Sequence, residues 1–165
     1  MNEITVFNAL LRAVTWNALT GVITLFVGMR IPRKLNADAF PFRLYGFERD
    51  GKIYRKLGVH LWKDRLPDAS RVFRRMTRKA LAGGSNPALL ERLVQETCVA
   101  EAVHWLLIAL SSAMLLFTPP RVGLTLCAVY ALGNLPFIII QRYNRPRLQN
   151  AVRLMRRRET VSAEE

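Results

Sequence analysis

The feature that most constrains this sequence is a set of long apolar stretches separated by strongly basic regions. The stretches cover residues of about 5–29, 99–118 and 122–140, and Arg12 and Glu101 are the two charged residues among them. About twenty consecutive apolar residues allow a helix to cross the hydrocarbon core of a bilayer. Helices satisfy their own backbone polar groups, as a membrane requires. The sequence therefore predicts an all-α membrane protein with three transmembrane helices.

The length and charge of the chain indicate how such a protein is arranged. With 165 residues and a net charge of +13, we expect one integral membrane domain spanning residues 1–165. The basic residues gather in residues 30–98 and 141–165, and basic flanks stay cytoplasmic. We therefore expect the N-terminus outside and the C-terminus in the cytoplasm. Anionic lipids are the expected partner of the basic surface, and nucleic acid is disfavoured because apolar spans alternate with the basic regions.

The polar region between the first two spans shows two local patterns. Arg49-Asp50-Gly51 lies among aromatic residues between Phe42 and Tyr54, and Asp-Gly is a strong turn signal, which predicts a short β-hairpin. After Leu66, the apolar residues of 68–80 recur at helical spacing among basic residues. This predicts a cytoplasmic amphipathic helix on an anionic membrane surface; a solvated charged face is the alternative.

The second and third spans are predicted to form an antiparallel helical hairpin. Asn86-Pro87 is a good helix start, and nothing interrupts the pattern until Pro119-Pro120. A short turn there returns the chain through residues 122–140, and Gln141–Arg147 is expected to end that helix. The remaining tail has the pattern of a further amphipathic helix. In such a hairpin, the beginning of the second span faces the end of the third.

One polar pair marks the second span. Glu101 and His104 are three residues apart, so they share a face of a helix. Ionisable groups in a membrane span are costly and are functional candidates. The hairpin brings them to the level of residues 138–145, at the cytoplasmic interface. The alternative is that Glu101 and His104 form an interfacial polar pair with a structural role.

These residue types suit the transfer of an acyl group to a hydroxyl. We expect His104 to be the general base and Glu101 to orient it. No Ser or Cys lies in a nucleophile motif, which favours direct transfer over a covalent intermediate. The expected substrate-binding residues comprise Arg142, Asn144 and Arg145 for an oxyanion or an anionic donor head, Trp62, Lys63 and Asp68 to close the pocket, and Glu96, Thr97, Asn134 and Gln141 beside the reacting groups.

Other candidates carry less weight. His60 and Asp64 are also one helical turn apart, but this spacing is a common accident. Cys98 and Cys127 have neither a disulfide nor a zinc spacing. We expect no metal site, because two histidines and scattered carboxylates define no ligand set.

Several ordered motifs resemble one known family. They are Arg30-Ile-Pro, Phe47-Glu48 with Gly51-Lys52, Trp62-Lys63, Glu-Thr-x3-Glu-x2-His-Trp at 96–105, and Gln-Arg-Tyr-Asn-Arg-Pro-Arg-Leu at 141–148. Together they resemble the glycosyl-4,4'-diaponeurosporenoate acyltransferase family of small bacterial membrane proteins.

The resemblance implies a specific reaction and location. The reaction is fatty acyl transfer to the C6 hydroxyl of a glucosyl carotenoid ester, in a staphyloxanthin-type pathway at the bacterial cytoplasmic membrane. Donor and acceptor would both be lipid-like, with acyl-CoA or a similar thioester as a possible donor and no bound cofactor. The alternative from another class is a non-catalytic membrane protein whose basic cytoplasmic face binds anionic lipid or a partner enzyme.

Overall fold

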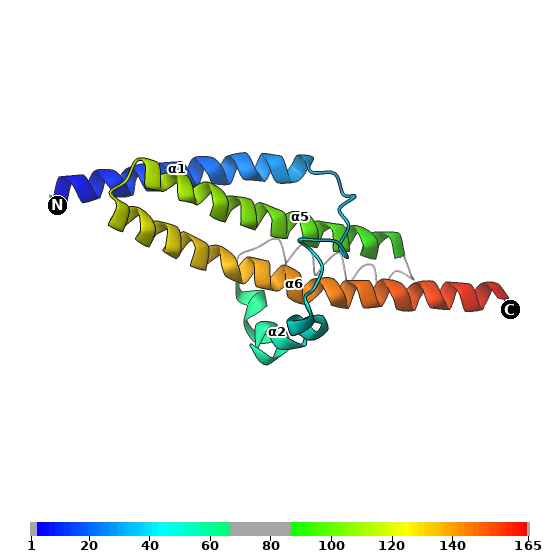
Figure 1. The fold of residues 1–165 in the computed structure, drawn as a ribbon. Coiled ribbons are helices and arrows are strands. Elements are labelled where there is room, and N and C mark those ends of the chain that lie inside the picture. Colours follow the sequence, from blue (N-terminus) through cyan, green and yellow to red (C-terminus); the bar gives the residue numbers. More distant parts are fainter. Residues whose placement is uncertain (1–2, 67–86, 165) are drawn as a thin grey trace. The chain divides into compact units, whose positions relative to one another are not determined.

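The protein is built from helices throughout the part of the chain that the structure describes. The structure is a computed structural model that describes residues 3–66 and 87–164. Three long helices dominate it, α1 (Glu3–Arg30), α5 (Pro87–Ser111) and α6 (Pro120–Glu164), and no strand occurs within the described ranges (Figure 1). Short helices lie between them in the chain: η1 (Gly46–Gly51), α2 (Lys52–Lys56), α3 (Val59–Trp62), η2 (Lys63–Arg65) and η3 (Ser112–Leu116).

The predicted fold class is confirmed. Among the described residues, three helices are long and apolar enough to cross a membrane, over Val6–Arg30, Pro87–Leu116 and Pro120–Val161. The described chain forms two compact units, Met1–Ile31 with Ala102–Ile138, and Pro32–Glu101 with Ile139–Glu165. We call them the first and the second unit.

In the first unit, α1 packs on the C-terminal part of α5 through a few specific contacts. The Trp16 indole Nε1 donates to the Leu110 carbonyl at 2.9 Å, and its ring meets Phe117 edge-on. Gly28 lies so close to α5 that a Cβ there would be 2.9 Å from Val103 Cγ2. Outward-pointing side chains such as Phe7 are exposed, at 65%. Exposed apolar side chains on such a helix suit contact with lipid.

The turn between α5 and α6 is short, as predicted. Helix η3 follows α5 directly, and α6 begins at Pro120, a first-turn position where proline costs no hydrogen bond. The Thr118 hydroxyl donates to the Met114 carbonyl and the Gly123 N–H donates to the Pro119 carbonyl. These bonds satisfy backbone carbonyls where the two helices meet.

The expectation that Gln141–Arg147 ends the third helix is wrong. Helix α6 continues for 45 residues to Glu164, through Pro136 and Pro146. A proline inside a helix removes one backbone hydrogen bond and usually kinks or breaks it. Here Tyr143, Arg145 and Leu148 are buried beside Pro146, and packing on both sides of the proline holds the helical backbone.

The expected β-hairpin is also wrong, although its turn residue is real. Gly51 has a φ of 83°, the left-handed conformation that favours glycine. It joins η1 to α2 rather than two strands. Tyr54 and Val59 then pack on Ile140 and Tyr143 of α6 in the core of the second unit. Helical packing against α6 therefore overrides the strand tendency of the aromatic residues. The predicted amphipathic helix of 68–80 lies outside the described residues.

Candidate functional site

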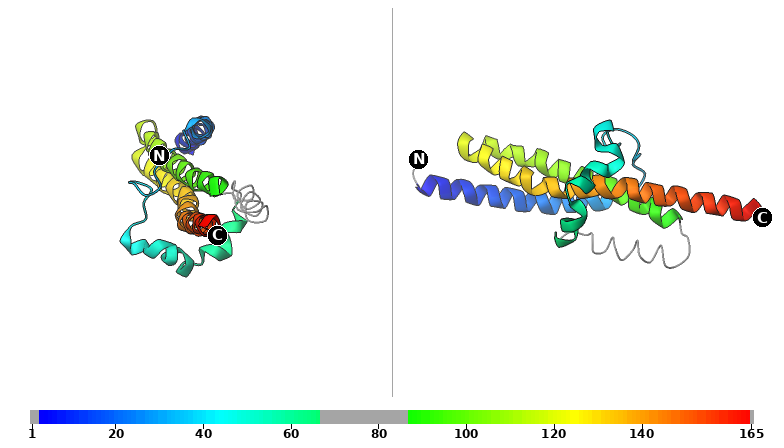
Figure 2. Two further views of the ribbon diagram at one scale, coloured as in Figure 1. Left: turned by 90° about the vertical axis from the view of Figure 1, so that its right-hand side faces the viewer. Right: turned by 90° about the horizontal axis from the view of Figure 1, so that it is seen from below.

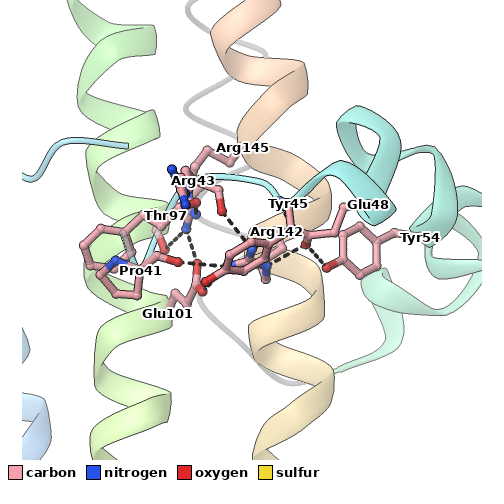
Figure 3. Close-up of polar contacts among 10 residues, drawn as sticks. Pro41, Arg43, Tyr45, Glu48, Tyr54, Thr97, Glu101, Arg142 and Arg145 are labelled. Carbon is pink, nitrogen blue, oxygen red and sulfur yellow. Dashed lines mark hydrogen bonds and ion pairs between the residues drawn. The ribbon is translucent and has the colours of Figure 1, made fainter. Parts of the chain in front are cut away.

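A buried network of charged side chains joins α5, α6 and η1 within the second unit, and carbonyls of the loop before η1 take part in it. Its centre is the Arg142 guanidinium (Figure 3). Arg142 Nε and Nη2 donate to the two oxygens of Glu48, each at 2.7 Å. Nη1 donates to Glu101 Oε1 at 2.7 Å, and the remaining protons reach the carbonyls of Pro41 and Arg43. All five N–H groups of this guanidinium therefore have a partner.

Arg145, one helical turn further along α6, binds the other oxygen of the Glu101 carboxylate. Its Nη2 donates to Glu101 Oε2 and to the Thr97 carbonyl, while Nε donates to the Thr97 hydroxyl at 2.9 Å. Nη1 donates to the Phe42 carbonyl. Glu101 thus bridges two arginines, and the 41–43 loop is tied to α6 through the same two arginines.

The network combines burial with charge balance. Glu48 and Glu101 have exposed fractions of 0%, Arg145 of 1% and Arg142 of 8%. Each carboxylate is paired with at least one guanidinium, so the two negative and two positive charges cancel. Buried charges are tolerated when they are paired and hydrogen-bonded.

Glu48 is the second carboxylate of the network, and its partners are Arg142, Tyr54 and Tyr45. Burial by itself would raise the pKa of this carboxyl, but hydrogen bonds from Arg142, Tyr54 and the Tyr45 N–H outweigh it and lower the pKa below its ordinary value. Burial, followed by the neighbouring Glu48 carboxylate, raises the pKa of the Tyr54 phenol well above its ordinary value. Glu48 is therefore ionised and Tyr54 is a neutral donor to it.

A second polar arrangement lies in the first unit. His104 Nδ1 is 2.8 Å from Asn134 Oδ1, and the Asn134 amide nitrogen donates to the Tyr130 carbonyl at 2.9 Å. The imidazole also stacks on the Phe137 ring, with 4.8 Å between ring centroids and 7° between planes. An amide oxygen accepts only, so Nδ1 carries the proton in the neutral ring and Nε2 is its basic nitrogen.

The structure brings together many of the predicted site residues. Thr97, Glu101, Arg142 and Arg145 meet in the buried network, and His104 meets Asn134. Others are placed elsewhere: Glu96 pairs with Arg33 at 3.1 Å, Trp62 packs against the core of the second unit, Lys63 contacts Asp64, Gln141 and Asn144 are half-buried on α6, and Asp68 lies outside the described residues.

Sequence reasoning missed Glu48 and Tyr54 as members of the network. One signal pointed to Glu48, which is an acidic residue in a strongly basic region and part of the Phe47-Glu48 motif. Its distance of 94 residues from Arg142 hid the pairing.

The described residues also form a cavity, and they contain no cluster of metal ligands. A hollow of about 340 Å³ is lined by residues of the second unit that include Asp38, Glu91, Gln95 and Gln149. None of the predicted site residues within the described ranges lines it. Across 3–66 and 87–164, no group of three His, Cys, Asp or Glu side chains is placed to hold a metal ion.

The fold and these polar arrangements define a class, an all-helical membrane protein whose spanning helices carry buried ionisable side chains. Comparison with known proteins narrows the class to a family. The family model of glycosyl-4,4'-diaponeurosporenoate acyltransferase matches residues 38–154. The chain belongs to this family and is an acyltransferase.

Curated relatives agree with the family model. The chain is 33% identical over 135 residues to the glycosyl-4,4'-diaponeurosporenoate acyltransferase of Staphylococcus aureus strain MRSA252, which covers 80% of this chain and 81% of that protein. The protein of the same name from strain USA300 is 32% identical over the same shares. No solved structure matches the chain. The resemblance stated from the motifs is therefore confirmed.

Proposed function

We propose that this acyltransferase moves a fatty acyl group from an activated donor onto a sugar hydroxyl of a glycosylated, membrane-dissolved acceptor. The relatives are named for a glycosylated carotenoid acid, and a staphyloxanthin-type acceptor is the corresponding proposal here. The carrying observation is the His104–Asn134 hydrogen bond, because it orients a basic nitrogen on a helix suited to crossing a membrane.

His104 is the proposed general base, and Asn134 is its positioning residue. Nε2 would take the proton of the acceptor hydroxyl as its oxygen attacks the carbonyl carbon of the donor. The resulting imidazolium would then give that proton to the leaving group as the bond from carbonyl carbon to leaving group breaks. A thioester donor such as acyl-CoA fits this scheme, because its thiol leaves once it is protonated.

We assign the buried network a structural role and no direct contact with the reacting groups. Arg142 already uses all five N–H groups within the protein. Contact with an oxyanion would require one of these bonds to break, which favours a structural role for Arg142 over the predicted direct contact. We propose that Glu101 acts with Arg142 and Arg145 to hold α5 against α6. Its predicted role in orienting His104 stays a prediction.

The proposed orientation places the basic regions in the cytoplasm and the N-terminus outside. It rests on the excess of Lys and Arg in residues 30–98 and 141–165. Reporter fusions at the two ends test it: cytoplasmic signal from the C-terminal fusion alone is expected, and the reverse would overturn it.

Product analysis tests the proposed function directly. The purified chain in lipid vesicles would be given a glycosylated carotenoid acid and a fatty acyl thioester, and extracts would be examined by mass spectrometry. We expect a product heavier than the acceptor by one acyl group, esterified on the sugar. If neither this acceptor nor other glycolipids gained an acyl group, the proposal would fail.

Two variants of Asn134 test the positioning role. Asn134→Asp keeps an acceptor for the Nδ1 proton and adds a charge that favours the imidazolium, so it should retain turnover with a displaced pH profile. Asn134→Leu removes the acceptor and should lose about tenfold to a hundredfold in kcat at unchanged KM. Equal activity and equal pH profiles in both variants would exclude the role.

A further inference from the structure

The helical segment Gly46–Leu66 exposes several large apolar side chains. Phe47, Leu57 and Leu61 have exposed fractions of 67%, 60% and 68%. Phe40, just before the segment, reaches 76%. Single exposed apolar side chains are ordinary in proteins, but several within one short segment indicate a surface that meets another apolar phase.

The buried side chains of this segment show which part of α6 it packs against. Tyr54 and Val59 are buried against Ile140 and Tyr143, with Ile139 packed beside them. Figures 1 and 2 show α2 beside this part of α6 in each view. All of these residues belong to the second unit.

This level is where the apolar stretch of α6 ends. Residues 137–140 are Phe-Ile-Ile-Ile, and Gln-Arg follows at 141–142. A spanning helix changes from apolar to charged residues where it leaves the hydrocarbon core. The segment Gly46–Leu66 therefore packs on α6 at the depth of the interface between hydrocarbon and headgroups.

The charges of the segment complement an anionic lipid surface. Lys52, Arg55, Lys56 and Arg65 are exposed, whereas Glu48 is buried and already paired with Arg142. Exposed basic residues next to exposed apolar ones are typical of segments that lie in a membrane interface.

We propose that the segment Gly46–Leu66 lies in the interface of the membrane that α6 crosses, with Leu57 and Leu61 among the acyl chains and the basic side chains against anionic headgroups. The occupant of this exposed surface is thus an anionic bilayer. The inference does not depend on the reaction that the protein catalyses.

Spin labels on the full-length protein in vesicles test the proposal. Leu57→Cys and Leu61→Cys would each carry a nitroxide, with Arg55→Cys as the matched control from the same segment. Because all three side chains are exposed, the labels leave the packing intact. Cys98 is buried, and Cys127→Ser removes the other native thiol while keeping a hydrogen-bond donor toward the Ser111 carbonyl.

Collision rates with oxygen and with a water-soluble nickel chelate give the depth of each label. In phosphatidylglycerol vesicles we expect the labels at Leu57 and Leu61 roughly 5–10 Å below the phosphates, and the label at Arg55 at or above them. Equal nickel access at all three positions would place the segment in water and overturn the proposal. Labels shielded from both reagents would indicate a protein partner and would also overturn it.

A change of lipid tests the charge contribution. Replacing phosphatidylglycerol by phosphatidylcholine should make both leucine labels shallower, because the anionic surface no longer attracts the basic side chains. Unchanged depths would overturn the assignment of an anionic surface.

Discussion

Replacing Glu48 by Gln should lower the free energy of unfolding far more than replacing an exposed glutamate. The variant removes one carboxylate that contacts Arg142 through two 2.7 Å hydrogen bonds, at a position with no exposed surface. The guanidinium stays buried with less compensating charge. Removing one partner of a buried ion pair costs about 3–5 kcal/mol, and we expect this loss in the free energy of unfolding.

The matched control is Glu91→Gln, which breaks the ion pair with Arg156. Those side chains are 42% and 65% exposed, and an exposed pair contributes about 1 kcal/mol or less. Both variants of the full-length protein would be unfolded by denaturant in the same detergent and followed by circular dichroism. If Glu48→Gln cost no more than Glu91→Gln, the network would not stabilise the fold as argued.

Three further predictions follow from the same contacts. Because the folded pKa of Glu48 lies below its ordinary value of 4.5, its stabilisation is complete above pH 4.5 and is lost as the pH falls below it, so acid-unfolding curves of Glu48→Gln should fall less steeply there. Gly51→Ala forces a side chain into a left-handed backbone and should cost about 1–2 kcal/mol in chemical unfolding. Gly28→Ala places a Cβ against Val103 and should cost about 1–3 kcal/mol, whereas Gly21→Ala, with open space around it, should not lower the thermal midpoint.

The sequence was sufficient to predict the spans and the level at which polar residues meet. Residues 99–118 and 122–140 are joined by a very short turn, so the beginning of the second span must face the end of the third. That argument placed Thr97 and Glu101 opposite Arg142 and Arg145, and the hydrogen bonds between these residues confirm it.

The sequence was insufficient wherever long-range packing decides the local structure. Pro146 is a helix-breaking signal, but burial of Tyr143 and Arg145 around it keeps α6 helical. Asp-Gly predicts a turn at Gly51 without saying whether strands or helices flank it. The pairing of Glu48 with Arg142 depends on how the loop before η1 folds back, which no periodicity encodes.

The most direct test of the account compares the two histidines of the chain. His104→Gln and His60→Gln would be assayed for acyl transfer in vesicles, with the amount of membrane-inserted protein measured for each. We expect His104→Gln to lose about a hundredfold or more in kcat while it still accumulates in the membrane, and His60→Gln, an exposed residue, to keep full activity. Full activity in His104→Gln would contradict the assignment of His104 as the base.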